Sequence, residues 1–386
     1  MRIPETVRRL SRQAAFAFIA WALAVPSVAS SVVAGAHRAA SPQEKNEDKK
    51  SEAFKIQKLT QGLGLYAIGP VSPDGKSVLL LAQKPQQSPN LYLMNLTDHS
   101  IRPPLTALKW GVSNPAWSPD GQMIAMAGAS EVAAFPEIYV LELTSGKMRQ
   151  LTRNAFSDKE PVFTPNGKKI LYSSDESPLP DAAFGILHVA AMPVGGGKAE
   201  YFTDDEASSL LPGISADEKS VLLVKVSDAT GRHSLWQYSF EGKPLRDLTE
   251  TKFARIRSYR VIKGTQTIVL SAQEQAEQQD QVYLLDSGSG KITELPDPDL
   301  IKRNPSVSPD GKLIVFLGAA RNGAQLFLYD ISSGELKQLT HKGFNNHTPV
   351  FASNTTILFG SDREKEDNNE LYLLDLEQQS EEKKKR

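Results

Sequence analysis

Residues 115–152 read PAWSPDGQMIAMAGASEVAAFPEIYVLELTSGKMRQLT, a stretch in which short apolar runs alternate with turn residues. This pattern predicts four strands, at 115–117, 123–126, 138–141 and 148–152. In the first turn Pro119 fixes φ, Asp120 can hydrogen-bond to its own backbone, and Gly121 accepts a positive φ. The second and third strands are almost continuously apolar, as expected when both faces of a sheet are covered.

The same arrangement recurs along the chain at a spacing of about 46 residues. The clearest copies of the first turn lie at 72–75, 118–121, 164–167 and 308–311. Leu-Thr or Phe-Thr pairs end the units at 105–106, 151–152, 202–203, 248–249 and 339–340. A period of roughly 40 to 50 residues with several short strands in each unit is typical of a β-propeller.

Seven units can be distinguished, which predicts an all-β, seven-bladed β-propeller of four-stranded antiparallel blades. The first six units span 68–106, 115–152, 161–203, 214–249, 259–296 and 305–340. The seventh starts at Pro349 and supplies three strands but no fourth. Residues 54–60 match the missing strand, because Thr60 precedes Thr106 by one repeat. We therefore expect this N-terminal strand to close the ring in the last blade, which leaves no exposed edge.

The two ends of the chain are predicted to lie outside the propeller, which occupies 54–376. Residues 1–36 resemble an export signal, with four arginines that precede a short apolar run, and an uncleaved anchor is the alternative. Residues 37–53 predict a disordered polar linker, and 377–386 a charged disordered tail. The expected location is periplasmic or secreted, with no stable membrane span after signal cleavage.

Composition excludes several kinds of chemistry. The formal net charge of −1 provides no basic field that would favour nucleic acid. The chain contains no Cys, so disulfides, thiolate nucleophiles and Cys-ligated metal sites are excluded. No Gly-x-Ser-x-Gly nucleophile motif occurs, and the glycine-rich segments 195–198 and 288–291 fit hairpin turns better than phosphate loops. We expect a monomer.

The sequences Pro-Val-Phe-Thr-Pro-Asn-Gly at 161–167 and Pro-Ser-Val-Ser-Pro-Asp-Gly at 305–311, with the Leu-Thr endings, resemble the TolB-type propeller repeat. The resemblance covers residues 54–376 and implies an exported scaffold protein. TolB itself has a folded α/β domain before a six-bladed propeller, whereas seven blades and a short linker are predicted here. Similar Pro-Asp-Gly repeats occur in propellers of the prolyl oligopeptidase family, where a hydrolase domain follows.

The connections between blades are predicted to form the mouth of a central channel. A mixed-charge rim around a polar funnel suits the docking of a protein or peptide partner of the cell envelope, with exposed aromatic side chains as anchors. Each aromatic residue of these connections could equally be tucked under its own blade. The candidate ligand- or partner-binding residues are Trp110, Asn114, Phe156, Glu160, Phe253, Arg257, Asn304, Phe344, Asn345 and His347.

Two other functions remain open at the same mouth. Glu160, Asn304 and His347 offer oxygen ligands and one imidazole, which could bind a divalent cation such as Ca²⁺. Such a cation would support a metal-dependent hydrolase or lyase, and no other cofactor is expected. The third alternative is the binding of a saccharide or cell-wall fragment. The leading interpretation is a non-catalytic binding scaffold.

Overall fold

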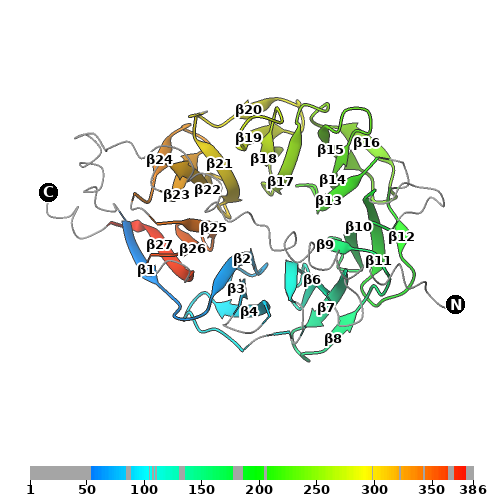
Figure 1. The fold of residues 1–386 in the computed structure, drawn as a ribbon, viewed down its shortest axis with the longest axis horizontal. Coiled ribbons are helices and arrows are strands. Elements are labelled where there is room, and N and C mark those ends of the chain that lie inside the picture. The colour runs from blue at the N-terminus through cyan, green and yellow to red at the C-terminus, as the bar shows by residue number, and fades with distance from the viewer. Residues whose placement is uncertain are drawn as a thin grey trace, which may run out of the picture.

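Seven sheets are arranged around a common axis in the computed structural model (Figure 1). The structure describes residues 54–83, 88–103, 105–106, 108, 111–129, 135–176, 186–203, 207–297, 299–320, 323–341, 344–363 and 369–379. These residues form 27 strands and, within the ranges just given, no helix. The predicted seven-bladed β-propeller is therefore confirmed.

The sheets follow one another in chain order, and each is called a blade, numbered 1 to 7. The innermost strands are β2 (Leu65–Val71), β5 (Val112–Trp117), β9 (Asp158–Phe163), β13 (Ser209–Ile214), β17 (Arg255–Val261), β21 (Ile301–Val307) and β25 (Asn346–Phe351). The second strands are β3 (Ser77–Ala82), β6 (Met123–Ala129), β10 (Lys169–Ser174), β14 (Val221–Val226), β18 (Thr267–Gln273), β22 (Leu313–Ala320) and β26 (Thr356–Ser361). The third strands are β4 (Asn90–Asn95), β7 (Pro136–Glu142), β11 (His188–Pro193), β15 (His233–Tyr238), β19 (Gln281–Asp286), β23 (Gly323–Asp330) and β27 (Glu370–Gln379). The outermost strands are β8 (Met148–Gln150), β12 (Glu200–Tyr201), β16 (Pro244–Asp247), β20 (Ile292–Glu294), β24 (Leu336–Gln338) and β1 (Phe54–Lys58).

The N-terminal strand closes the ring, as predicted. In Figure 1 the blue strand β1 lies beside the red strand β27, and the two pair in antiparallel orientation. Ile56 pairs with Leu374 and Lys58 with Tyr372, and the amide of Leu59 donates to the carbonyl of Leu371 at 2.8 Å. β27 also continues to Gln379, so the propeller extends beyond the predicted boundary at residue 376.

The repeated turn has the predicted chemistry. In blade 2 the Ser118 hydroxyl donates to Asp120 Oδ1 at 2.6 Å, and the Gln122 amide donates to the same oxygen at 3.0 Å. Gly121 has a φ of 69°, where a side chain would be unfavourable. The hydrogen bond from Ser118 lowers the pKa of the Asp120 carboxyl. The turn residues therefore form a local hydrogen-bonded unit.

In six of the seven blades the threonine that follows the last segment hydrogen-bonds to the third strand. In blade 2 Thr152 Oγ1 accepts from the Ile138 amide at 2.9 Å and donates to Glu137 Oε2 at 2.7 Å. Blade 6 repeats this with Thr340 and Gln325, whose Oε1 accepts at 2.8 Å. Both donors and acceptors are buried, so the Leu-Thr repeat has a structural cause: the hydroxyl satisfies buried polar groups.

Blade 1 differs from the four-stranded pattern, because the structure describes three regular strands in it. Its fourth segment makes an isolated bridge between Ile101 and Met94 and single backbone bonds from Arg102 and Leu105. Pro103 has no amide hydrogen to donate, which interrupts a regular ladder.

The core lies between neighbouring blades. Leu79 and Leu81 of β3, for example, pack with Ile124 and Met126 of β6, and all four side chains are buried. Each sheet is thus covered on both faces, which explains the apolar second and third strands.

Candidate functional site

Five innermost strands contain a β-bulge, formed by a residue with positive φ followed by proline. The bulge interrupts the pairing of β5, β9, β13, β21 and β25 with their second strands. The residues with positive φ are Asn114 (49°), Glu160 (57°), Leu211 (54°), Asn304 (52°) and Thr348 (42°). This conformation costs roughly 1–3 kcal/mol for a residue with a side chain. Because the bulge recurs at equivalent positions of five blades, it is a regular feature of the strands that line the central channel.

Five candidate residues predicted in the connections between blades lie inside strands instead. Arg257 and His347 lie in β17 and β25. Asn114, Glu160 and Asn304 lie at the bulges of β5, β9 and β21. The proline after each of them had been read as the start of the strand. Because proline cannot donate to a ladder, it is instead accommodated at the bulge in the middle of the strand.

Glu160 uses its bulge to link two blades. Its Oε2 accepts from Ser173 Oγ at 2.8 Å within blade 3, and from the Leu211 amide of blade 4 at 3.0 Å. Burial raises the pKa of Glu160, and these two hydrogen bonds oppose the rise. Thr348 makes the equivalent link from blade 7 to blade 1, accepting from the Ile68 amide at 3.3 Å.

The aromatic candidates occupy different environments. Phe253 is fully buried, and its ring centroid lies 5.0 Å from that of Tyr283, so it is a core residue and not the exposed anchor that was predicted. Phe156 and Phe344 are partly exposed. The Arg363 guanidinium lies 5.4 Å from the Phe344 ring centroid. Trp110 lies outside the described residues.

Asn345 and His347 lie at the start of blade 7. Asn345 is exposed, and its amide and side chain donate to Asp362 at 2.8 and 3.1 Å. His347 Nδ1 lies 3.1 Å from Thr348 Oγ1. Burial lowers the pKa of His347 to about 4, so its ring is neutral at pH 7.

The three metal-ligand candidates belong to three different blades: Glu160 to blade 3, Asn304 to blade 6 and His347 to blade 7. Within the described part of the chain, no group of three or more His, Cys, Asp or Glu side chains is arranged to hold a metal ion. Asn304 is exposed, whereas the carboxylate of Glu160 is engaged in the link to blade 4.

A charged cluster between blades 5 and 6 contains Arg257, which was predicted as a candidate, and Asp280 and Arg303, which were not. Arg257 Nε lies 2.5 Å from Asp280 Oδ1, and Arg303 Nε lies 2.6 Å from Asp280 Oδ2. The Asp280 side chain is 1% exposed, and the arginine side chains are 38% and 32% exposed. Arg257 is the extra residue of the bulge in β17, and Arg303 immediately precedes the bulge in β21. Asp280 precedes β19, in a connection without any repeated sequence signal.

The ends of the strands define two faces. The innermost strands begin on the upper face, and because the strands are antiparallel, the third strands begin there too. The lower face carries the repeated Ser-Pro-Asp-Gly turns. Asp280, Arg257 and Arg303 therefore lie toward the upper face, as does Asn345.

A second buried polar cluster joins blades 2 and 3. Asn154 donates its backbone amide to Glu137 at 2.9 Å and its side-chain amide to Asp158 at 3.2 Å. Both acids are fully buried, and burial raises the pKa of each carboxyl. These contacts connect the third strand of one blade to the innermost strand of the next.

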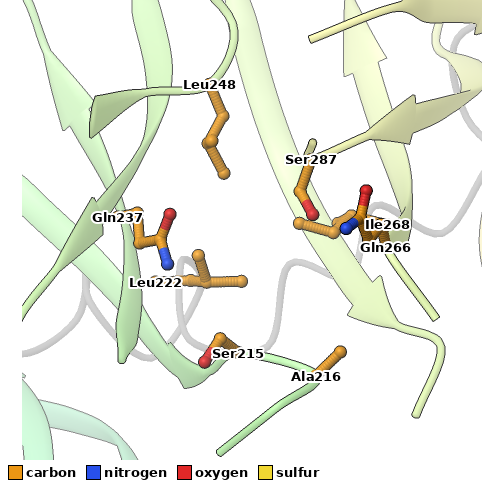
Figure 2. Close-up of a pocket in the computed structure, with 8 residues that line it drawn as sticks. All are labelled: Ser215, Ala216, Leu222, Gln237, Leu248, Gln266, Ile268 and Ser287. Atoms are coloured by element: carbon orange, nitrogen blue, oxygen red, sulfur yellow. The ribbon is translucent and has the colours of Figure 1, made fainter. Parts of the chain in front are cut away.

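Two cavities differ in what they could hold. The one between blades 4 and 5 (Figure 2) has a volume of about 30 Å³ and is lined by polar side chains such as Gln237 and Gln266. That volume is sufficient for about one water molecule. The other is a groove of about 370 Å³ on the lower face between blades 1 and 2, beside Arg102, Trp117 and Asp120.

The repeat and its geometry agree with a comparison to known families. The model of the TolB β-propeller domain matches residues 52–259, which is more than half of the chain. The chain belongs to the TolB β-propeller family. This confirms the resemblance predicted from the repeats.

Individual relatives of this propeller are distant. It is 25% identical over 146 residues to the uncharacterized peptidase YuxL of Bacillus subtilis, covering 29% of this chain and 22% of that protein. It is 22% identical over 213 residues to the Tol-Pal system protein TolB of Francisella tularensis subsp. mediasiatica, covering 55% of this chain and 46% of that one. The chain thus spans less than half the length of these curated relatives.

Solved structures support the fold. An oligogalacturonate lyase in complex with manganese matches with a TM-score of 0.64 at 14% identity, covering 86% of this chain and 95% of that one. At this identity the likeness concerns the fold alone. No helix in the described residues has the length and apolar character needed to cross a membrane.

Proposed function

We propose that this TolB-family propeller is a non-catalytic scaffold that binds a protein or peptide of the cell envelope on its upper face. The observation that carries the proposal is a set of polar side chains fixed on that face, by one contact between blades 5 and 6 and by contacts within blades 5 and 7. Arg257 and Arg303 are held by Asp280, and Asn345 is bonded to Asp362. Fixed, partly exposed polar groups around a rim favour specific docking, because little side-chain conformational entropy is lost on binding.

Family membership supports the same proposal, since one relative is a component of the Tol-Pal system. The export signal predicted at 1–36 would deliver the chain to the periplasm or the exterior. The peptidase relative is matched over only 22% of its length, so its activity is not transferred to this chain.

The proposal is tested by placing a photo-crosslinking residue on each face. Benzoylphenylalanine replaces Glu277, an exposed residue of the upper face, or Lys243, an exposed residue of the lower face. After irradiation in envelope extracts, we expect an adduct of discrete mass from position 277 and none from position 243. Equal labelling from both positions, or no adduct from position 277, would refute docking on the upper face.

A further inference from the structure

We propose that Arg257 and Arg303 form a binding site for a carboxylate group of an acidic peptide, between blades 5 and 6 on the upper face. This inference deepens the proposed function and rests on it for the class of ligand. The carboxylate could belong to a Glu or Asp side chain or to a peptide C-terminus, since both present the same planar anion.

Arg257 and Arg303 each keep N–H donors that make no hydrogen bond within the described structure. A guanidinium carries five N–H donors in a planar fork, and each of these arginines uses Nε to contact Asp280. Among the described residues, neither side chain makes another hydrogen bond or ion pair. Both side chains are about one third exposed, so solvent reaches them while Asp280 stays buried. Asp280 is therefore a positioning residue that holds the guanidinium groups of Arg257 and Arg303 where solvent can reach them.

The local charge balance favours an added anion. Two arginines face a single carboxylate, which leaves one positive charge without a close partner of opposite sign in the described structure. The neighbouring Lys302 is fully buried, and its ammonium donates to Gln281 Oε1 at 2.6 Å and to the carbonyls of Asp297 and Leu300. Burial lowers the pKa of Lys302, and Glu294, Asp297 and Asp299 oppose this effect. Those acids thus act on the lysine, whereas no ion pair joins them to the arginines in the described residues.

The shape and charge of the site select the ligand class. A planar carboxylate matches the guanidinium fork and can accept two parallel hydrogen bonds. The single negative charge of a carboxylate would balance the one positive charge that Asp280 leaves unpaired in the cluster. The connection before β21 carries the exposed acids Asp297 and Asp299, which would repel a polyanion that extended over it.

The test uses three synthetic peptides and the full chain. Ac-Gly-Glu-Glu-Gly-NH₂ carries side-chain carboxylates, Ac-Gly-Ala-Ala-Gly-OH carries only a C-terminal carboxylate, and Ac-Gly-Gln-Gln-Gly-NH₂ is neutral. Dissociation constants are measured by fluorescence polarisation with labelled peptides at low salt. We expect at least one carboxylate peptide to bind more tightly than the neutral one, and the tighter of the two identifies the source of the carboxylate.

Substitutions locate the binding. Arg257→Gln and Arg303→Gln should each weaken the preferred carboxylate peptide by about 10- to 100-fold, the usual range for losing hydrogen bonds to a charged group. The matched control is Arg255→Gln, which removes the same charge from an exposed position on the same strand, and it should change affinity less than threefold. Arg257→Lys and Arg303→Lys keep the charge but lose the fork, and they should also weaken binding. Thermal melting of each variant verifies that it is folded.

Two results overturn the site: equal binding of the neutral and carboxylate peptides, or wild-type affinity in folded Arg257 and Arg303 variants. This failure is separable from failure of the proposed function. Crosslinks from position 277 without carboxylate preference would leave the docking face intact. If carboxylate peptides bind at the arginines but position 277 gives no crosslinks, the carboxylate site is supported and the proposed docking of an envelope protein is refuted.

Discussion

Replacing Thr60 by valine tests how the ring is closed. Thr60 Oγ1 donates to Glu370 Oε2 at 2.5 Å and accepts from the Leu371 amide at 2.9 Å. It therefore joins the segment after β1 to β27, a separation of about 310 residues along the chain. All of these groups are buried. Valine has nearly the same shape but offers neither the donor nor the acceptor.

The expected loss follows from the groups that are left without partners. A buried backbone donor that loses its acceptor costs about 1–3 kcal/mol, and the Leu371 amide is such a donor. Among the described residues the Glu370 carboxylate has two donors and loses one of them, because the Gly62 amide still donates to Oε1, so a further cost of about 1 kcal/mol is expected. The free energy of unfolding should fall by about 2–4 kcal/mol.

The assay is urea unfolding followed by tryptophan fluorescence. With an m-value of about 3 kcal/mol/M, the midpoint should fall by roughly 1 M. Thr144→Val is the matched control, because Thr144 is exposed and makes one long hydrogen bond, at 3.3 Å to Gln122. It should change stability by less than about 0.5 kcal/mol. If Thr60→Val unfolds at the same urea concentration as the wild type, closure through Thr60 does not contribute to stability and the reasoning is wrong.

Two further predictions concern pH. Burial raises the pKa of Asp158 above its ordinary 3.8, so the contribution of this carboxyl to stability should be lost as pH rises above that value. Asp158→Asn should reduce the fall between urea midpoints at pH 4.5 and 7, while Glu137 and Glu160, whose pKa values burial also raises, keep their share. Burial lowers the pKa of His347 from 6.5 to about 4, so stability should be lost as pH falls through this window, by at most about 3 kcal/mol. His347→Gln should flatten that loss, and an unchanged slope between pH 6.5 and 4 would contradict the assignment.

The propeller could be predicted from sequence because its determinants are local and repeated. The turn at 118–121 needs only its own residues, and the spacing between copies counts the blades. Closure by residues 54–60 followed from the same count. Even the irregular fourth segment of blade 1 has a local cause in Pro103, although the sequence interpretation did not use it.

The candidate site was less predictable, because it depends on contacts between blades. Phe253 and Phe344 look equivalent in sequence, yet one is buried against Tyr283 and the other is partly exposed. Glu160 was assigned to a connection because its proline resembled the start of a strand. Asp280 was missed because the partners that define it, Arg257 and Arg303, belong to two blades and lie on either side of it in sequence.

The way the ring closes has a mechanical consequence. Phe54 pairs with Gln379, so the folded chain enters and leaves the propeller at one end of the β1–β27 ladder. A force applied through the segments before Phe54 and after Gln379 would open that ladder one pair at a time, instead of shearing all pairs together. Tension between the two ends would thus open blade 7 first while the other six blades keep their own hydrogen bonds.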